Sequence, residues 1–239
     1  MRIGDWATRF NISVKRCEER PDAPAGDIVY RIKDIFTTRD GSWEPSAREG
    51  SLPAWAREAY LRPHTARLNA LTLSAAGRTA RDLLLADLQR LRAHGLAPEL
   101  NCFQAYPRDE PTAVVPTDVY SFHADRAPVP ADTWLCTYHG PASEGLRNEE
   151  AQKRVDDPAI RAALLKEYGG ADDADFREYL SANSYDLHYA PLPHAQPFSF
   201  GVHHLWRIAT DYPDSPVPPC IHRAPATLPG HPPRLLLIS

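Results

Sequence analysis

Proline is the residue that most restricts how this chain can fold. The 239-residue sequence contains 24 prolines, about twice the average share of roughly 5%. Because proline lacks a backbone N–H and fixes φ, it interrupts helix interiors and central strands. The chain is therefore expected to form short elements joined by many loops.

Short segments rich in β-branched and aromatic residues lie between proline-containing turns in the second half of the chain. They predict strands at Leu100–Tyr106, Asp118–His123, Thr133–Tyr138, Ser199–Ala209 and Pro233–Ile238. Short strands separated by such turns are typical of a β-sandwich or barrel. The first half is less regular, with strand character at 27–35 and a polar loop at 37–50.

The clearest helical pattern covers residues 79–94. Its leucines at 83, 84, 88 and 91 form one apolar stripe, and Gly95 is a natural helix end. A weaker helical pattern begins near Pro53. Charged, helix-compatible sequence returns at 147–182, between predicted strands. We expect the helix at 79–94 to pack on a sheet and the segment at 147–182 to be a helical insertion.

The length and the 43% hydrophobic content fit one domain with a real core. We predict a single domain over 1–239. Residues from 1 to about 98 would supply flanking strands and helices. Residues from about 99 to 239 would form the β core, with the insertion near 147–182.

Composition excludes several classes of function. The net charge is −4 and no long basic run exists, so nucleic acid is not an expected partner. No run of about 18 apolar residues and no apolar leader is present, which predicts a cytoplasmic protein without a membrane partner. The four cysteines form no CxxC pair and are expected to be free, buried thiols. The sequence does not indicate an oligomeric state.

One triplet carries metal-binding chemistry. His123 and Asp125 lie two residues apart, and in an extended chain residues i and i+2 point to the same side. An imidazole and a carboxylate on one face suit a first-row divalent metal. His222 is a third candidate ligand. Arg234 follows it by 12 residues (234 − 222) in an apolar strand, so its side chain is expected to point into the same cavity.

This order of residues resembles the Fe(II)/2-oxoglutarate-dependent oxygenase superfamily over roughly residues 100–239. The resemblance implies a double-stranded β-helix, a jelly-roll of the cupin type, with helices on one side. It implies Fe(II) held by His123, Asp125 and His222, and 2-oxoglutarate held by Arg234. An Arg fork binds a carboxylate bidentately. Arg223 is the rival anchor, but it neighbours His222 and should face the other way.

The sequence departs from the family pattern after Arg234. Many members carry a small hydroxyl residue two positions later, where this chain has Leu236. Thr137 or Tyr138 would then supply the hydroxyl beside the cosubstrate. A fainter resemblance to an uncharacterised bacterial domain family, in the Cys-Thr-Tyr-x-Gly-Pro block, implies that Thr137, Tyr138 and Glu144 face the same site.

Four residues are candidates for contact with substrate: Trp134, Glu144, Trp206 and Arg207. The alternatives are purely structural roles: core packing for the aromatic residues and a surface salt bridge for Arg207. The predicted function is oxidation, such as hydroxylation, of a small organic molecule, for example an amino acid or a natural-product intermediate. A cupin-type dioxygenase or isomerase without 2-oxoglutarate is one alternative, and a non-catalytic jelly-roll binding protein is another.

Overall fold

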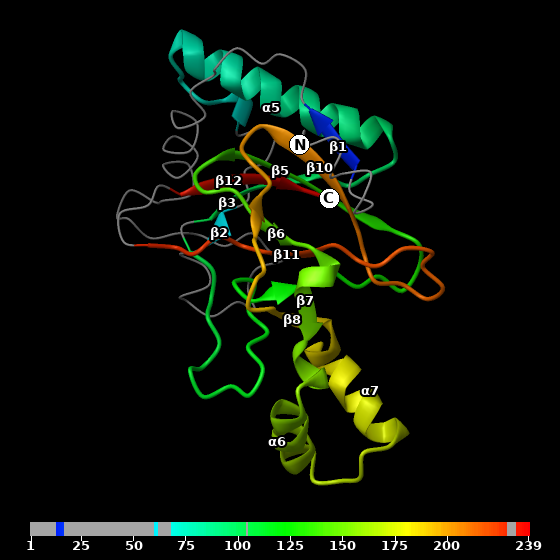
Figure 1. The fold of residues 1–239 in the computed structure, drawn as a ribbon. Coiled ribbons are helices and arrows are strands. Elements are labelled where there is room, and N and C mark those ends of the chain that lie inside the picture. The colour runs from blue at the N-terminus through cyan, green and yellow to red at the C-terminus, as the bar shows by residue number, and fades with distance from the viewer. Residues whose placement is uncertain (1–12, 17–59, 62–67, 104, 229–232) are drawn as a thin grey trace.

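The computed structural model describes residues 13–16, 60–61, 68–103, 105–228 and 233–239. Within these residues the chain is mainly β, as predicted, with two antiparallel sheets and three α-helices (Figure 1). The strand expected at 27–35, the loop at 37–50 and the start of the helix near Pro53 lie outside the described residues.

The first sheet has six strands in the order β1-β10-β5-β12-β3-β2. Their bounds are Ser13–Arg16 (β1), His204–Ala209 (β10), Asp132–His139 (β5), Arg234–Ile238 (β12), Glu99–Phe103 (β3) and Tyr60–Leu61 (β2). The predicted strand at 133–138 and the last strand are confirmed. The strand expected over 199–209 is interrupted, because His203 has a φ of 62° and turns the chain before β10 begins.

The second sheet also has six strands, in the order β7-β8-β4-β11-β6-β9. Their bounds are Ala151–Lys153 (β7), His188–Pro191 (β8), Phe122–His123 (β4), Ile221–Arg223 (β11), Glu144–Leu146 (β6) and Phe198–Ser199 (β9). Strand β4 is shorter than the predicted 118–123, because the two Asp118 carboxylate oxygens accept backbone N–H groups of the preceding loop, including those of Tyr120 and Ser121.

Helix α5 (Ala75–Ala93) covers the outer face of the first sheet (Figure 1). Ser74 caps its first turn by accepting a hydrogen bond from the Gly77 N–H at 3.0 Å. The buried leucines Leu84, Leu88 and Leu91 pack against side chains of the sheet, among them Cys102, Cys136, Tyr138, Leu205, Leu235 and Leu237. The predicted packing of this helix on a sheet is confirmed.

A second apolar cluster lies on the inner face of the first sheet. This inter-sheet cluster consists of Leu135, Phe200, Trp206, Ile208, Cys220 and Leu236. Cys220 directly precedes β11 of the second sheet, and Phe200 directly follows β9. The cluster therefore joins the two sheets across their facing sides.

The insertion at 147–182 is only partly helical. It starts with the 3-10 turn η1 (Asn148–Glu150), strand β7 and the 3-10 turn η2 (Arg154–Asp156). Only then does it form helices α6 (Pro158–Tyr168) and α7 (Ala174–Ala182). Asp157 and Asp173 cap these helices, and Gly169 ends α6 with a φ of 75°. The two helices pack around buried Leu164, Phe176 and Leu180, at the end of the molecule far from α5 (Figure 1).

Two predictions from composition can be compared with the fold. None of the helices within the described ranges combines the length and the apolar content needed to cross a membrane. Cys102, Cys136 and Cys220 are buried free thiols, as predicted, and Cys17 lies outside the described residues.

Candidate metal centre

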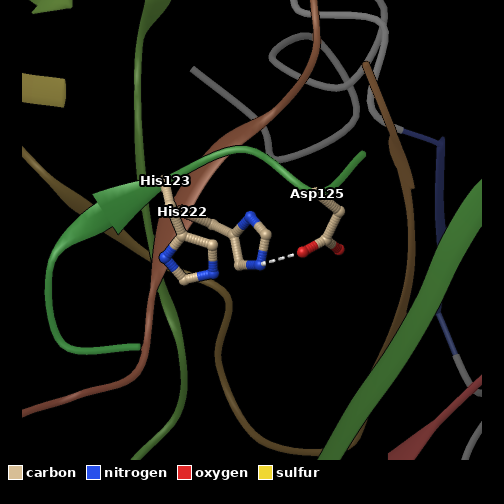
Figure 2. A group of neighbouring side chains, drawn as sticks. All are labelled: His123, Asp125 and His222. Carbon is tan, nitrogen blue, oxygen red and sulfur yellow. Dashed lines mark ion pairs between the residues drawn. The ribbon is translucent and has the colours of Figure 1, made fainter. Parts of the chain in front are cut away.

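Three predicted ligands lie together at the inner face of the second sheet. His123 at the end of β4 is the direct cross-strand partner of His222 in the middle of β11. Asp125 follows β4 on a loop and turns its carboxylate toward the two imidazoles (Figure 2). One ligand atom from each residue lies within 4.8 Å of the others. The sequence therefore predicted a real cluster, since the three residues come from two segments 99 positions apart (222 − 123).

The two histidines are oriented in the same way by the backbone. His123 Nδ1 lies 2.8 Å from the carbonyl oxygen of Ser121, and His222 Nδ1 lies 3.3 Å from that of Cys220. Each imidazole can donate its Nδ1–H to a carbonyl two residues earlier, which leaves the Nε2 lone pair free. Such outer hydrogen bonds fix the tautomer of metal-binding histidines.

Asp125 has an outer partner of its own. The hydroxyl of Thr133 on β5 donates to Asp125 Oδ2 at 2.6 Å. The other oxygen, Oδ1, lies 3.9 Å from His222 Nε2 (Figure 2). Thr133 lies on β5 of the first sheet, whereas Asp125 follows β4 of the second. This hydrogen bond therefore connects the two sheets at the site.

The protonation states suit a metal ligand set. Burial, with a smaller contribution from His222, lowers the pKa of His123 from 6.5 to about 4. Burial opposes ionisation of Asp125, but the neighbouring His222, the Thr133 hydrogen bond and His123 together hold its pKa below the usual value. At neutral pH the site thus offers a neutral His123 imidazole and a carboxylate, which are the forms that bind metal.

The donor atoms lie somewhat wider apart than around a bound ion. Two ligand bonds of about 2.1 Å at a right angle place their donor atoms about 3 Å apart, whereas His222 Nε2 and Asp125 Oδ1 lie 3.9 Å apart and the group spans up to 4.8 Å. Binding of one ion would therefore draw the three side chains closer together. Two imidazoles and one carboxylate are the facial set that binds Fe(II) and leaves positions open.

Replacing Thr133 with valine is expected to lower the affinity for Fe(II) or Co(II) about tenfold, because an outer partner of a ligand is lost. Calorimetric titration of the metal-free protein measures this. Thr210→Val is the matched control, since the Thr210 hydroxyl donates to the carbonyl of Ala131 and touches no ligand. Equal metal affinities in the two variants would contradict the role given to Thr133.

The metal-free protein is expected to lose stability as the pH falls from about 6.5 toward 4. Burial lowers the pKa values of both His123 and His188 to about 4. The unfolded chain then binds more protons than the folded chain in this window, so acid favours unfolding. Urea unfolding with a chelator present measures the effect. His188→Gln should flatten the dependence on pH, and an unchanged slope would argue against a buried neutral His188.

Arg234 is buried, and none of its hydrogen-bond partners among the described residues is acidic. Its side chain is 5% exposed, and its three nitrogens donate to the Pro141 carbonyl, the Tyr106 hydroxyl and the Ser143 hydroxyl at 2.8–3.0 Å. All three partners are neutral, and burial lowers the pKa of Arg234, with only tyrosines acting against it. A buried guanidinium without a carboxylate among the described residues is costly unless an anion joins it.

Thr137 and Tyr138 point to opposite sides of β5. Thr137 pairs with Leu236 of β12 on the inner face, and its buried hydroxyl has no hydrogen-bond partner among the described residues. The Tyr138 hydroxyl instead donates to Asp87 of α5 at 2.5 Å. Of the two predicted hydroxyls, only that of Thr137 therefore lies on the side of the inter-sheet cluster, and Tyr138 belongs to the outer core.

Glu144 does not join the triad. It pairs with Arg223 across β6 and β11, and its carboxylate accepts from Arg223 Nε and Nη2 at 2.7 Å. The two residues alternate with Gly145 and His222, so they face away from the metal ligands. The rival anchor Arg223 is thus already neutralised on the far face, as expected from its position beside His222.

The other substrate candidates also lie away from the ligands or within the core. Trp134 packs on the outer cluster under α5. Arg207 forms an ion pair with Asp132 at 2.5 Å, which is the salt-bridge alternative given for it above. Trp206 stacks on Phe200 with ring centroids 4.3 Å apart, and Phe200 in turn lies 6.4 Å from the His222 ring. Of these candidates, Trp206 is the one linked to the centre, through Phe200.

Sequence reasoning missed His188. It is the cross-strand partner of His123 on β8, is 4% exposed, and its ring centroid lies 5.7 Å from that of His123. Three imidazoles therefore follow one another across β8, β4 and β11. A lone histidine in a loop-rich segment carries no spacing signal, so only the strand register could reveal it.

A surface pocket of about 490 Å³ lies elsewhere, between Arg126, Ser181 and Tyr212. It contains none of the three ligands. Arg126 is neutralised there by Asp186 and Asp211 at 2.6 and 3.2 Å. This pocket therefore does not contain the candidate metal ligands.

Comparison with known proteins gave no match to a family model, to a curated protein or to a solved structure.

Proposed function

We propose that the protein is an Fe(II)/2-oxoglutarate-dependent oxygenase that oxidises a small organic molecule. The observation that carries the proposal is the triad of His123, Asp125 and His222, in which each ligand is held by its own outer hydrogen bond. Iron with 2-oxoglutarate supplies oxygen-activating chemistry, and the protein binds, orients and excludes water.

The strand order supports a double-stranded β-helix. Consecutive core strands alternate between the sheets, with β3, β5, β10 and β12 in one and β4, β6, β9 and β11 in the other. Within the first sheet the order is β3-β12-β5-β10, and within the second it is β4-β11-β6-β9. This interleaving, with the last strands returning between the first ones, is the pattern that a jelly-roll requires. Strands β7 and β8 extend the second sheet beside β4.

Arg234 supports 2-oxoglutarate as the cosubstrate. Within the described part of the chain its buried guanidinium has neutral partners, so the distal carboxylate of a dicarboxylic acid would balance its charge. Tyr106, one of those partners, packs against the inter-sheet cluster, and Phe200 of the same cluster stacks on His222. The Thr137 hydroxyl is available on the same face where the family pattern expects a hydroxyl after the Arg.

The experiment is stepwise loading of the purified protein without oxygen. Fe(II) and then 2-oxoglutarate should bind and give a visible absorption band that neither gives alone. Admission of air should release succinate. Metal binding without any 2-oxoglutarate binding would favour a cupin-type enzyme, and absence of metal binding would favour a non-catalytic protein.

A further inference from the structure

A second basic side chain lies on the opposite flank of the metal centre from β11. Strands β7 and β8 pair Lys153 with Tyr189, and the residues next to this pair are Arg154, the first residue of η2, and His188. Arg154 lies close enough to His188 for its charge to act on that imidazole. His188, His123 and His222 form one row across the inner face of the second sheet, and Arg154 lies at the β8 end of that row.

One nitrogen of Arg154 and one of His188 make no hydrogen bond with the described residues. Arg154 Nε and His188 Nδ1 are enclosed, yet neither has a hydrogen-bond partner among the described residues. Buried polar groups in native proteins are nearly always paired. Two adjacent donors that remain unpaired next to a metal centre indicate that a ligand supplies the acceptor.

No carboxylate among the described residues forms an ion pair with Arg154. Asp186 binds Arg126 at 2.6 Å, and Asp109 and Asp118 accept backbone N–H groups of their own loop. Arg154 is the charged neighbour that most strongly lowers the pKa of His188, after burial itself, and that pKa falls to about 4. The flank thus carries the single positive charge of Arg154, which matches a monoanion better than a phosphate dianion.

We propose that Arg154 and His188 bind the carboxylate of a small acidic substrate beside the metal. This inference rests on the proposed function and names its substrate class, a carboxylic acid. Arg234 on β12 of the other sheet would bind the carboxylate of the cosubstrate. The substrate and the cosubstrate would then each have their own cationic side chain near the metal.

The test uses acetate as the probe and the full-length, metal-free protein. Its readouts are the NMR signals of the Arg154 Nε–H and of the His188 ring nitrogens. Acetate should shift both saturably, and acetamide, its neutral isostere, should not. In Arg154→Gln, the His188 signals should need about tenfold more acetate, the loss expected for one charge-assisted hydrogen bond. Arg154→Lys should retain part of the affinity.

Lys153→Gln is the matched control, because Lys153 pairs with Tyr189 on the outer face of the sheet. It should leave acetate binding unchanged. The proposal is overturned if acetamide acts like acetate, if Arg154→Gln binds acetate as well as the wild type, or if inorganic phosphate binds there more tightly than acetate. Because neither iron nor 2-oxoglutarate is present, this result is independent of whether the protein is an oxygenase.

Discussion

Replacing His222 with alanine is expected to reduce Fe(II) affinity by roughly 100-fold or more and to abolish succinate release. The loss of a direct ligand costs more than the 10–100-fold typical of an outer partner. His222 occupies the centre of the site, between His123 on β4 and the ring of Phe200. Two remaining ligands, His123 and Asp125, cannot hold one face of the ion.

Isothermal titration with Co(II) under anaerobic conditions measures the affinity, and circular dichroism shows whether the variant folds. His194→Ala is the control, since His194 is exposed in the turn between β8 and β9 and is not part of the triad. His222→Gln keeps the side-chain volume and should also fail to bind. Retained metal affinity in both His222 variants would contradict the proposed function.

Replacing Arg234 with methionine is expected to weaken 2-oxoglutarate binding about 100-fold, or ~3 kcal/mol, while Fe(II) affinity stays the same. Truncating one partner of a buried, hydrogen-bonded charge pair costs about 2–5 kcal/mol. Methionine keeps much of the length and apolar character of the side chain, so Tyr106 and Ser143 lose a donor but the cavity is largely filled.

The control for Arg234 is the same substitution at Arg223. Arg223 is already paired with Glu144 on the far face, so Arg223→Met should leave 2-oxoglutarate affinity unchanged. Titration of the visible band of the Fe(II)-loaded protein gives both affinities. If Arg223→Met weakens 2-oxoglutarate and Arg234→Met does not, the anchor has been assigned to the wrong arginine. If neither does, the metal centre uses no such cosubstrate.

Two of the candidate metal ligands, His123 and Asp125, were predictable because their signal is local in the sequence. A His-x-Asp triplet at a strand end needs only the two-residue period of a strand to place both groups together. The distal His222 and Arg234 required the resemblance to a family, because no local rule connects residues 99 positions apart. Helix α5 was predictable from its leucine stripe, which is a property of the helix alone.

The residues around the ligands were less predictable, because the sequence does not say which face of a strand is inner. Thr137 and Tyr138 were both expected near the cosubstrate, but neighbours on one strand point to opposite sides, and Tyr138 binds Asp87 instead. Glu144 was placed at the site by resemblance, whereas a cross-strand charge pair with Arg223 holds it on the other face. His188 depends on the register of β8, which no short motif specifies.

The pairing of β4 with β11 affects the order in which folding and metal binding occur. Closing a loop of about 100 residues is entropically costly, and such non-local contacts form late and slowly in folding. The His123–His222 pair therefore exists only after β4 and β11 have paired within the second sheet. Iron should then bind only after the slow step of folding. It should therefore slow unfolding strongly and leave the refolding rate nearly unchanged.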